Sequence, residues 1–235
     1  MERQGTIEEI SDGKLYGGND MVKADCHDCA GCCECCKGMG ISIQLDPLDI
    51  HRISSYEGKG FEKLLEESVQ LNLVSGLILP NMKMDGQKEA CYYLDSKGRC
   101  RIHKARPGIC RLFPLGRYYE NREFHYFLQV NQCKNENRSK IKVKKWIDTP
   151  ELKKYEDFTV KWHFFIKDIQ EYLVKSGDKA LAKEMGMYIL TNFYMKPFSE
   201  AQDFYGEFEN RLLEANHYVQ EKIQSLSVQS NTAGV

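Results

Sequence analysis

The spacing of hydrophobic residues changes near residue 149. Beyond that point, apolar side chains recur every three or four residues, as they do along the buried face of an α-helix. Thr149-Pro150-Glu151 is a helix start signal, Ser176-Gly177-Asp178 ends one helix and caps the next, and Ser199 begins a capping-box sequence. The pattern predicts a three-helix region over residues 149–226 and a polar tail over residues 227–235.

Before residue 149, apolar residues occur only in short runs, which follow a polar lead over residues 1–24. Ala90–Leu94 and Arg99–His103 have the form of a hairpin with a glycine in its loop. Leu115–Tyr119 and Glu123–Val130 have the form of a second hairpin. We therefore expect an α+β protein, in which a small cysteine-rich part with short hairpins and helices is followed by a helical carboxy-terminal part.

The chain has ten cysteines, and six of them lie within the eleven residues from Cys26 to Cys36. The amino terminus shows no signal-peptide pattern, so we expect a cytoplasmic protein, in which thiols stay reduced and a disulfide framework is disfavoured. So many thiols in one short segment predict metal binding. Residues 25–148 are the predicted cysteine-cluster metal-binding domain.

Charge and hydropathy argue against two classes of partner. Lys and Arg number 33 and Asp and Glu number 34, so the net charge of −1 gives no electrostatic reason to expect binding to nucleic acid or to a membrane surface. The most apolar stretch, Leu71–Pro80, is far shorter than the ~20 residues of a membrane span. The expected partners are a metal ion or cluster and a protein that binds the carboxy-terminal helices.

The cysteine run has a regular spacing, because Cys26, Cys29, Cys32 and Cys35 occur at every third residue. A C-x2-C turn brings two thiolates to one side, where they can bind a tetrahedral zinc ion. Three cysteines at this spacing also resemble the ferredoxin pattern for an iron–sulfur cubane. Neighbouring side chains generally diverge, so we expect Cys35 and Cys36 to serve different partners, and two metal positions that share this segment are a further hypothesis.

A basic stretch contains two of the remote cysteines, Cys100 and Cys110. A centre with four thiolates is a dianion, so neighbouring cations would offset its charge, lower the thiol pKa values and tune a redox potential. Arg106 and Arg111 bracket Cys110 and are the predicted cofactor-binding side chains beside the ligands; the alternative is a solvated basic face that touches an anionic substrate. Between Asp95 and Glu120, where no acid lies, the basic residues are Lys97, Arg99, Arg101, Lys104, Arg106, Arg111 and Arg117.

Two signatures in the sequence resemble one family. Cys29-Ala-Gly-Cys32-Cys-Glu-Cys35-Cys36, followed by Ile41–Arg52, resembles the beginning of the CxxCxxCC (YkgJ-type) family of zinc- or iron-chelating domains. Cys91-Tyr-Tyr-Leu94, Gly98–His103 and Arg106–Pro114 are similar to its second signature. The resemblance extends over residues 26–133 and does not cover the helical region.

The resemblance implies a ligand set. Cys26 and Cys33 are extra to the family pattern, and Cys26-x2-Cys29-x2-Cys32-Cys33 fits the same formula one step earlier, although the downstream spacing favours the later register. In that later register the implied metal ligands are Cys29, Cys32, Cys35, Cys36, Cys91, Cys100, Cys110 and Cys133.

The family implies a metal but no activity. We expect a protein that holds a 4Fe–4S iron–sulfur cluster and/or zinc through cysteine thiolates, with a role related to redox chemistry or methyl transfer. The flagellin lysine-N-methylases, which are associated with an iron–sulfur cluster and methyl transfer, have a distantly similar cysteine arrangement. The alternative is structural zinc in a protein-interaction module without catalysis, so the sequence leaves open whether the chain is an enzyme.

Overall fold

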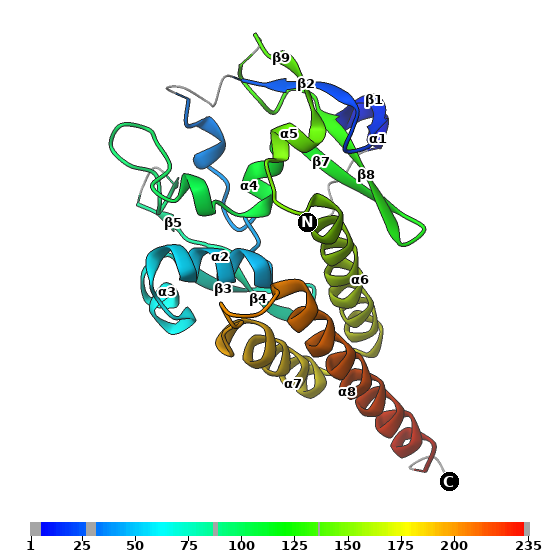
Figure 1. Ribbon diagram of the computed structural model, residues 1–235. Helices are drawn as coiled ribbons and strands as arrows, with labels where there is room; N and C mark the ends of the chain where they lie inside the picture. The colour runs from blue at the N-terminus through cyan, green and yellow to red at the C-terminus, as the bar shows by residue number, and fades with distance from the viewer. Residues whose placement is uncertain (1–5, 27–31, 87–88, 136, 233–235) are drawn as a thin grey trace.

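The computed structural model describes residues 6–26, 32–86, 89–135 and 137–232 of the 235-residue chain. The fold is α+β, as predicted, with short antiparallel strands and helices before a helical carboxy-terminal part (Figure 1). The strands are β1 (Ser11–Tyr16), β2 (Met21–Asp25), β3 (Val69–Val74), β4 (Leu77–Met82), β5 (Met84–Asp85), β6 (Ala90–Cys91), β7 (Leu115–Glu120), β8 (Glu123–Gln129) and β9 (Ser139–Lys142). The helical segments are α1 (Ile7–Ile10), η2 (Glu34–Cys36), α2 (Pro47–Glu57), α3 (Phe61–Glu67), η3 (His103–Ala105), α4 (Gly108–Leu112), α5 (Val143–Ile147), α6 (Leu152–Ser176), α7 (Lys179–Leu190), η4 (Thr191–Met195) and α8 (Phe204–Thr232).

The strands form small antiparallel sheets. The largest has the order β1-β8-β7, and β2 pairs with β9, β3 with β4, and β5 with β6. The segment predicted to be a polar lead therefore contributes two strands, β1 and β2, to the cysteine-rich part. The reason lies in a few inward-facing residues, since Val22 and Ala24 of β2 are 1% and 0% exposed. Such a short alternation is a weak signal in the sequence.

The second predicted hairpin is present and the first is present only in part. Strands β7 and β8 are joined by Asn121 and Arg122, which both have positive φ angles (50° and 59°), as a tight two-residue turn requires. In the first, Leu94 and Cys100 form a single isolated bridge, while β6 pairs with β5 instead. The remote cysteines thus lie in short irregular segments rather than in long ladders.

Two acids fix the start of α2. Asp46 is the N-cap, and its carboxylate accepts a hydrogen bond from the Asp49 backbone N–H (2.8 Å). The Asp49 carboxylate accepts in return from the Asp46 backbone N–H (3.2 Å). The preceding Ile41–Leu45 segment contacts β4 through an isolated bridge from Gln44 to Asn81. The Leu45 N–H also donates to the Pro80 carbonyl (2.9 Å), and the Ile43 carbonyl accepts from the Met82 N–H (2.8 Å).

The three predicted carboxy-terminal helices are α6, α7 and α8. Gly177 ends α6 with φ of 65°, and Asp178 caps α7 by accepting hydrogen bonds from two backbone N–H groups at 2.9 Å. The predicted capping box at Ser199 is wrong, because α8 begins at Phe204 and the Glu207 carboxylate accepts from the Ser199 backbone N–H (2.9 Å). Helix α8 also continues into the predicted polar tail.

One continuous hydrophobic core joins the two parts of the chain. The Tyr194 hydroxyl donates to the Leu45 carbonyl (3.0 Å), and the Gln170 amide donates to the Val74 carbonyl (2.8 Å). Helix α7 packs on β4 (Figure 1). The helices therefore support the β3–β4 hairpin and the start of α2, which in turn carry the cysteine segments. Among the helices of the described residues, none is long and apolar enough to cross a membrane.

Candidate metal centre

Four of the predicted ligands come together from separate segments. Cys35 lies in η2, Cys91 in β6, Cys100 in the bridge to Leu94, and Cys110 in α4. Repulsion from the charge of Cys35 raises the pKa of the Cys91 and Cys100 thiols. The charges of Cys35, Cys91 and Cys100 all raise the pKa of the Cys110 thiol. Because such interactions require proximity, these residues form one group, which we name the thiol cluster.

The thiol cluster favours protonated sulfur while it holds no cation. Burial is the largest cause that raises the pKa of the Cys91, Cys100 and Cys110 thiols. For Cys35 the largest cause is a side-chain hydrogen bond with Cys36, and burial comes second. A bound metal would reverse this balance and displace the protons, because the ligand is the thiolate.

Two of the clustered sulfurs accept hydrogen bonds from the backbone. The Tyr93 N–H donates to the Cys91 sulfur, and the Ile102 N–H donates to the Cys100 sulfur, and each bond acts to lower the pKa of its thiol. In both cases the donor lies two residues after the cysteine. Backbone N–H groups directed at sulfur stabilise thiolates and tune the potential of iron–sulfur centres.

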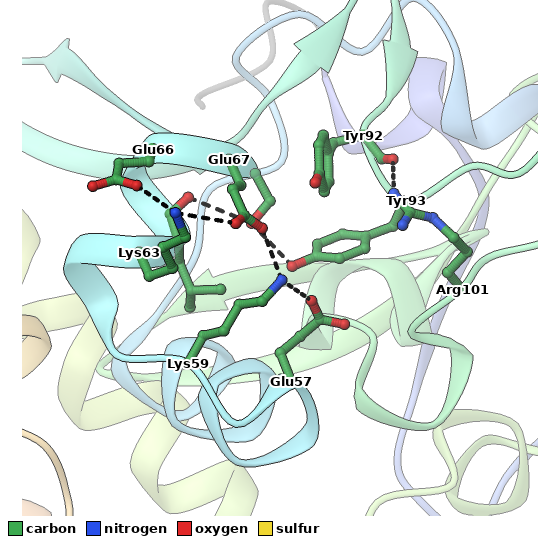
Figure 2. A network of polar contacts seen from close by, with 10 residues as sticks. Glu57, Lys59, Lys63, Glu66, Glu67, Tyr92, Tyr93 and Arg101 are labelled. Carbon is green, nitrogen blue, oxygen red and sulfur yellow. Dashed lines mark hydrogen bonds and ion pairs between the residues drawn. The ribbon is translucent and has the colours of Figure 1, made fainter.

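Figure 2 shows how the segment after Cys91 is anchored. Tyr93 is 1% exposed, and its hydroxyl donates to the Ser68 hydroxyl at 2.9 Å. Lys59 forms an ion pair with Glu67 (2.7 Å) close to this hydroxyl. The ion pair is partly exposed and contributes little by itself, so the buried Tyr93 ring supplies most of the anchoring.

Arg101 links the two neighbouring cysteine segments. Its guanidinium donates to the Tyr92 carbonyl (2.6 Å) and lies over the rings of Tyr92 and Tyr93, at 5.0 and 5.5 Å from their centroids (Figure 2). Because Arg101 follows Cys100 and Tyr92 follows Cys91, these contacts hold the two cysteines in a fixed relation. Sequence reasoning had assigned Arg101 only to the basic stretch.

Asp49 positions the helix that carries Cys110, and sequence reasoning missed this role. Its carboxylate is buried (3% exposed) and accepts from the Gly108 backbone N–H at 2.7 Å, at the first residue of α4. A Cβ atom at Gly108 would lie 2.2 Å from the Tyr155 hydroxyl oxygen, so only glycine fits there. The available signal was the second acid of Asp46-Pro47-Leu48-Asp49, which lies three residues after the N-cap.

The structure gives the two predicted arginines different positions. The charge of Arg106 acts to lower the pKa of both Cys35 and Cys100, so Arg106 lies beside the thiol cluster. Arg111 is 8% exposed, and its guanidinium donates to the carbonyls of Arg106 (3.2 Å), Asp148 (3.0 Å) and Lys104. Arg111 thus ties the η3 loop to the end of α5.

Cys32 and Cys133 lie near a different pair of charges. Lys134, the neighbour of Cys133, forms an ion pair with Glu34 of η2. The charge of Cys32 raises the pKa of both Lys134 and Lys37, so Cys32 lies near both ammonium groups. This places the segment after Cys133 beside the cysteine run, although the two are about a hundred residues apart in sequence.

The remaining cysteines complete the comparison with the predicted ligand set. The side chain of Cys36 hydrogen-bonds to that of Cys35, so the expectation that these two side chains diverge is wrong. Cys29 lies outside the described residues. Of the two cysteines that are extra to the family pattern, Cys26 is buried next to the end of β2 (5% exposed). The side chain of Cys33 lies against Gly98 and hydrogen-bonds to Lys37.

The donor set of the thiol cluster fits a soft metal, with one restriction on geometry. Thiolates suit zinc, iron and iron–sulfur clusters, and Arg106 and the backbone N–H groups are placed to stabilise negative sulfur. Within the parts of the chain that the structure describes, however, no three or more His, Cys, Asp or Glu side chains are placed so that they could hold a metal ion. The thiols are thus gathered but do not converge on one point.

A family comparison agrees with this chemistry. The model named CxxCxxCC, described as "Putative zinc- or iron-chelating domain", matches residues 25–146, just over half of the chain. The site therefore belongs to the class of cysteine-based, zinc- or iron-chelating domains, and the chain is a member of the CxxCxxCC family. No curated protein and no solved structure matches the chain.

Proposed function

We propose that the protein holds an iron–sulfur cluster on Cys35, Cys91, Cys100 and Cys110. The observation that carries this proposal is the thiol cluster itself, in which four sulfurs interact without converging on a single point. A zinc ion needs all its sulfurs at ~2.3 Å from one centre, whereas a cubane takes each thiolate on a different iron and so accepts thiolates that are farther apart.

The chain's own groups would then act on the sulfurs. The thiolates hold the cluster, Arg106 offsets their negative charge, and the N–H groups of Tyr93 and Ile102 donate to sulfur. A bound iron–sulfur cluster supplies one-electron transfer, so the proposed role is redox. A role in methyl transfer would need a methyl-donor site, and the sequence contains no segment that we can match to one.

The other predicted ligands are proposed for a second metal position. Cys32 and Cys133 lie near Lys37 and Lys134, and Cys36 lies next to Cys35 at the edge of the thiol cluster. Cys29 belongs with them by its place in the family pattern. Their position beside the cluster supports the hypothesis that two metal positions share the cysteine run.

A structural-zinc interaction module is the second candidate. Helices α6, α7 and α8 each expose a large apolar side chain, namely Val174 (68%), Met187 (50%) and Leu213 (73%). Exposed apolar residues on helices are a means of binding a protein partner. Under this candidate the metal would only stabilise the fold and the helices would bind the partner.

Anaerobic purification separates the two candidates. The iron–sulfur proposal expects a brown protein with iron and matching sulfide in the purified chain, and Cys110→Ser should lose both. Cys33→Ser is the matched control, because its thiol lies against Gly98 and is extra to the family pattern. A colourless preparation with stoichiometric zinc and no sulfide would support the interaction module and refute the cluster.

We also propose that the protein works in the cytoplasm. Ten cysteines in one chain stay available as metal ligands only where thiols are kept reduced. Fractionation of cells that express the full chain, followed by quantification of its metal, tests this placement.

A further inference from the structure

A cleft of about 980 Å³ lies beside the thiol cluster, between α2, η3 and α5. Its volume is that of a site for a small organic molecule. The side chains of Arg106 and Arg111 line it, so part of the basic stretch found in the sequence faces this cleft. The cleft is separate from the sulfurs, because none of the residues that line it is a cysteine.

Positive charge predominates in the lining. The cations are Arg52, Lys104, Arg106, Arg111 and Lys145, against two acids, Asp25 and Asp148. Both acids have partners within the fold. The Asp25 carboxylate accepts a hydrogen bond from the Ser139 hydroxyl (2.9 Å), and the negative charge of Asp148 attracts the Arg111 guanidinium and acts to raise its pKa. Although Arg52 also interacts with Asp46 and Asp49, the cations outnumber the acids in the lining and favour an anion there.

Two of these cations also have donors that the fold leaves unused. The Nη1 atom of Arg52 and the Nε atom of Arg106 are buried and have no hydrogen-bond partner among the described residues. Arginine stays charged in a protein, and a buried guanidinium N–H without an acceptor is costly. Both residues line the cleft, so an acceptor bound there would remove this cost.

We propose that the cleft binds a small organic molecule through an oxyanion group, a phosphate or a carboxylate, held by Arg52 and Arg106 with Lys104 and Lys145 at its rim. The planar guanidinium donors match the oxygens of either group. Trp146 and Tyr56 also line the cleft and offer ring surface to the rest of the ligand. The inference does not rest on the proposed iron–sulfur cluster, since no cysteine lines the cleft and Arg106 lies beside the thiols whichever metal they hold.

Isothermal titration calorimetry of the metal-loaded full chain tests this, with phenyl phosphate as the phosphate probe and benzoate as the carboxylate probe. We expect saturable binding of at least one probe at one site per chain. Arg52→Gln should weaken it about tenfold or more. Tighter binding of one probe assigns the oxyanion to phosphate or to carboxylate.

Two double variants make the test specific. Lys104 and Lys145 are exposed, so Lys104→Gln with Lys145→Gln keeps the fold and should weaken binding about fivefold or more even if Arg52→Gln fails to fold. Lys63→Gln with Arg122→Gln removes the same net charge at exposed positions outside the cleft and should leave binding unchanged. The proposal is overturned if neither probe binds at millimolar concentration, or if both double variants weaken binding equally.

Discussion

The carboxy-terminal helices bury aromatic rings, whereas the cysteine-rich part buries thiols and charged groups. The ring centroid of Phe208 on α8 lies 4.6 Å from that of Phe158 on α6. The ring centroids of Phe193 and Trp162 lie within 6.2 Å of that of Phe208. In the cysteine-rich part the buried charged groups are Asp49 and Arg111, and Asp46 is half-buried beside Asp49. The aromatic rings of the helices stabilise the fold by packing against one another. The buried charged groups are stable only when each has a hydrogen-bond or ion-pair partner.

Because of this difference, the stability of the two parts should depend on bound metal to different extents. The helical part has a continuous aromatic interior that needs no ligand. In the cysteine-rich part, short elements such as η2, β6 and α4 meet at sulfur atoms, which contribute little apolar burial. We therefore expect metal to hold the second part together and to matter less for the first.

The largest expected effect is that of removing a ligand. Cys110→Ser should abolish metal binding to the thiol cluster, because a ligand thiolate supplies bond energy on which local folding depends. Hydrogen exchange should then increase strongly in β6 and α4 and remain slow in α6 and α7. Cys33→Ser serves as the control. An equal increase of exchange in all four elements would show that the helical part also depends on the metal, and would contradict the expected difference between the two parts.

The next effect concerns the aromatic interior. Phe208 is 1% exposed, so Phe208→Ala should lower the free energy of unfolding by about 3–5 kcal/mol. Leu213→Ala on the same helix is the control, because Leu213 is 73% exposed and should cost less than about 0.5 kcal/mol. Urea denaturation measures both. Loss of metal from folded Phe208→Ala protein would show that the aromatic interior also supports metal binding, contrary to this expectation.

The acid pair Asp46 and Asp49 gives a smaller effect that depends on pH. Burial raises the pKa of Asp46 to about 8, and the charge of Asp49 is the next cause. An unfolded aspartate titrates near about 3.9, so the folded chain binds more protons between these values. The contribution of Asp46 to stability is therefore present at low pH and is lost as the pH rises through about 8.

Denaturation with metal content held constant measures this effect. The free energy of unfolding should fall by about 2 kcal/mol between about pH 6 and about pH 8, and Asp46→Asn should flatten the profile. Asp157→Asn changes an exposed acid on α6 and should leave the profile as in the parent. A parent profile without slope in this range would show that Arg52 and Arg117 hold the pair fully ionised.

The helical part could be predicted from sequence because its signals are local. Asp178 follows a glycine and begins a periodic run, so both the end of α6 and the start of α7 could be located from a few neighbouring residues. The error at Ser199 arose because Glu207, eight residues away, accepts its backbone N–H, which a local capping rule does not consider. Even in the helical part, therefore, a contact between residues outside one helical turn determines where α8 begins.

The cysteine-rich part was harder to predict because its contacts are distant in sequence. The family pattern indicated the cysteines, but spacing could not group Cys35 with Cys91, Cys100 and Cys110. The contact from Asp49 to Gly108 joins residues 59 positions apart, and no periodicity indicates it. The basic stretch was equally ambiguous, since a run of cations does not tell which guanidinium faces sulfur and which faces a carbonyl.

The smallest effect separates the two arginines that the sequence treated alike. Arg106 acts on Cys35 and Cys100, so Arg106→Gln should make an iron–sulfur centre harder to reduce, by on the order of 1 kcal/mol, and lower its midpoint potential. Arg111 donates to three carbonyls, so Arg111→Gln should lower the free energy of unfolding by about 1–3 kcal/mol and leave the midpoint unchanged. Redox titration and urea denaturation of both variants, at equal iron content, provide the two readouts. A fall in midpoint for Arg111→Gln alone would place that guanidinium beside the sulfurs after all, and would remove Arg106 from the proposed centre.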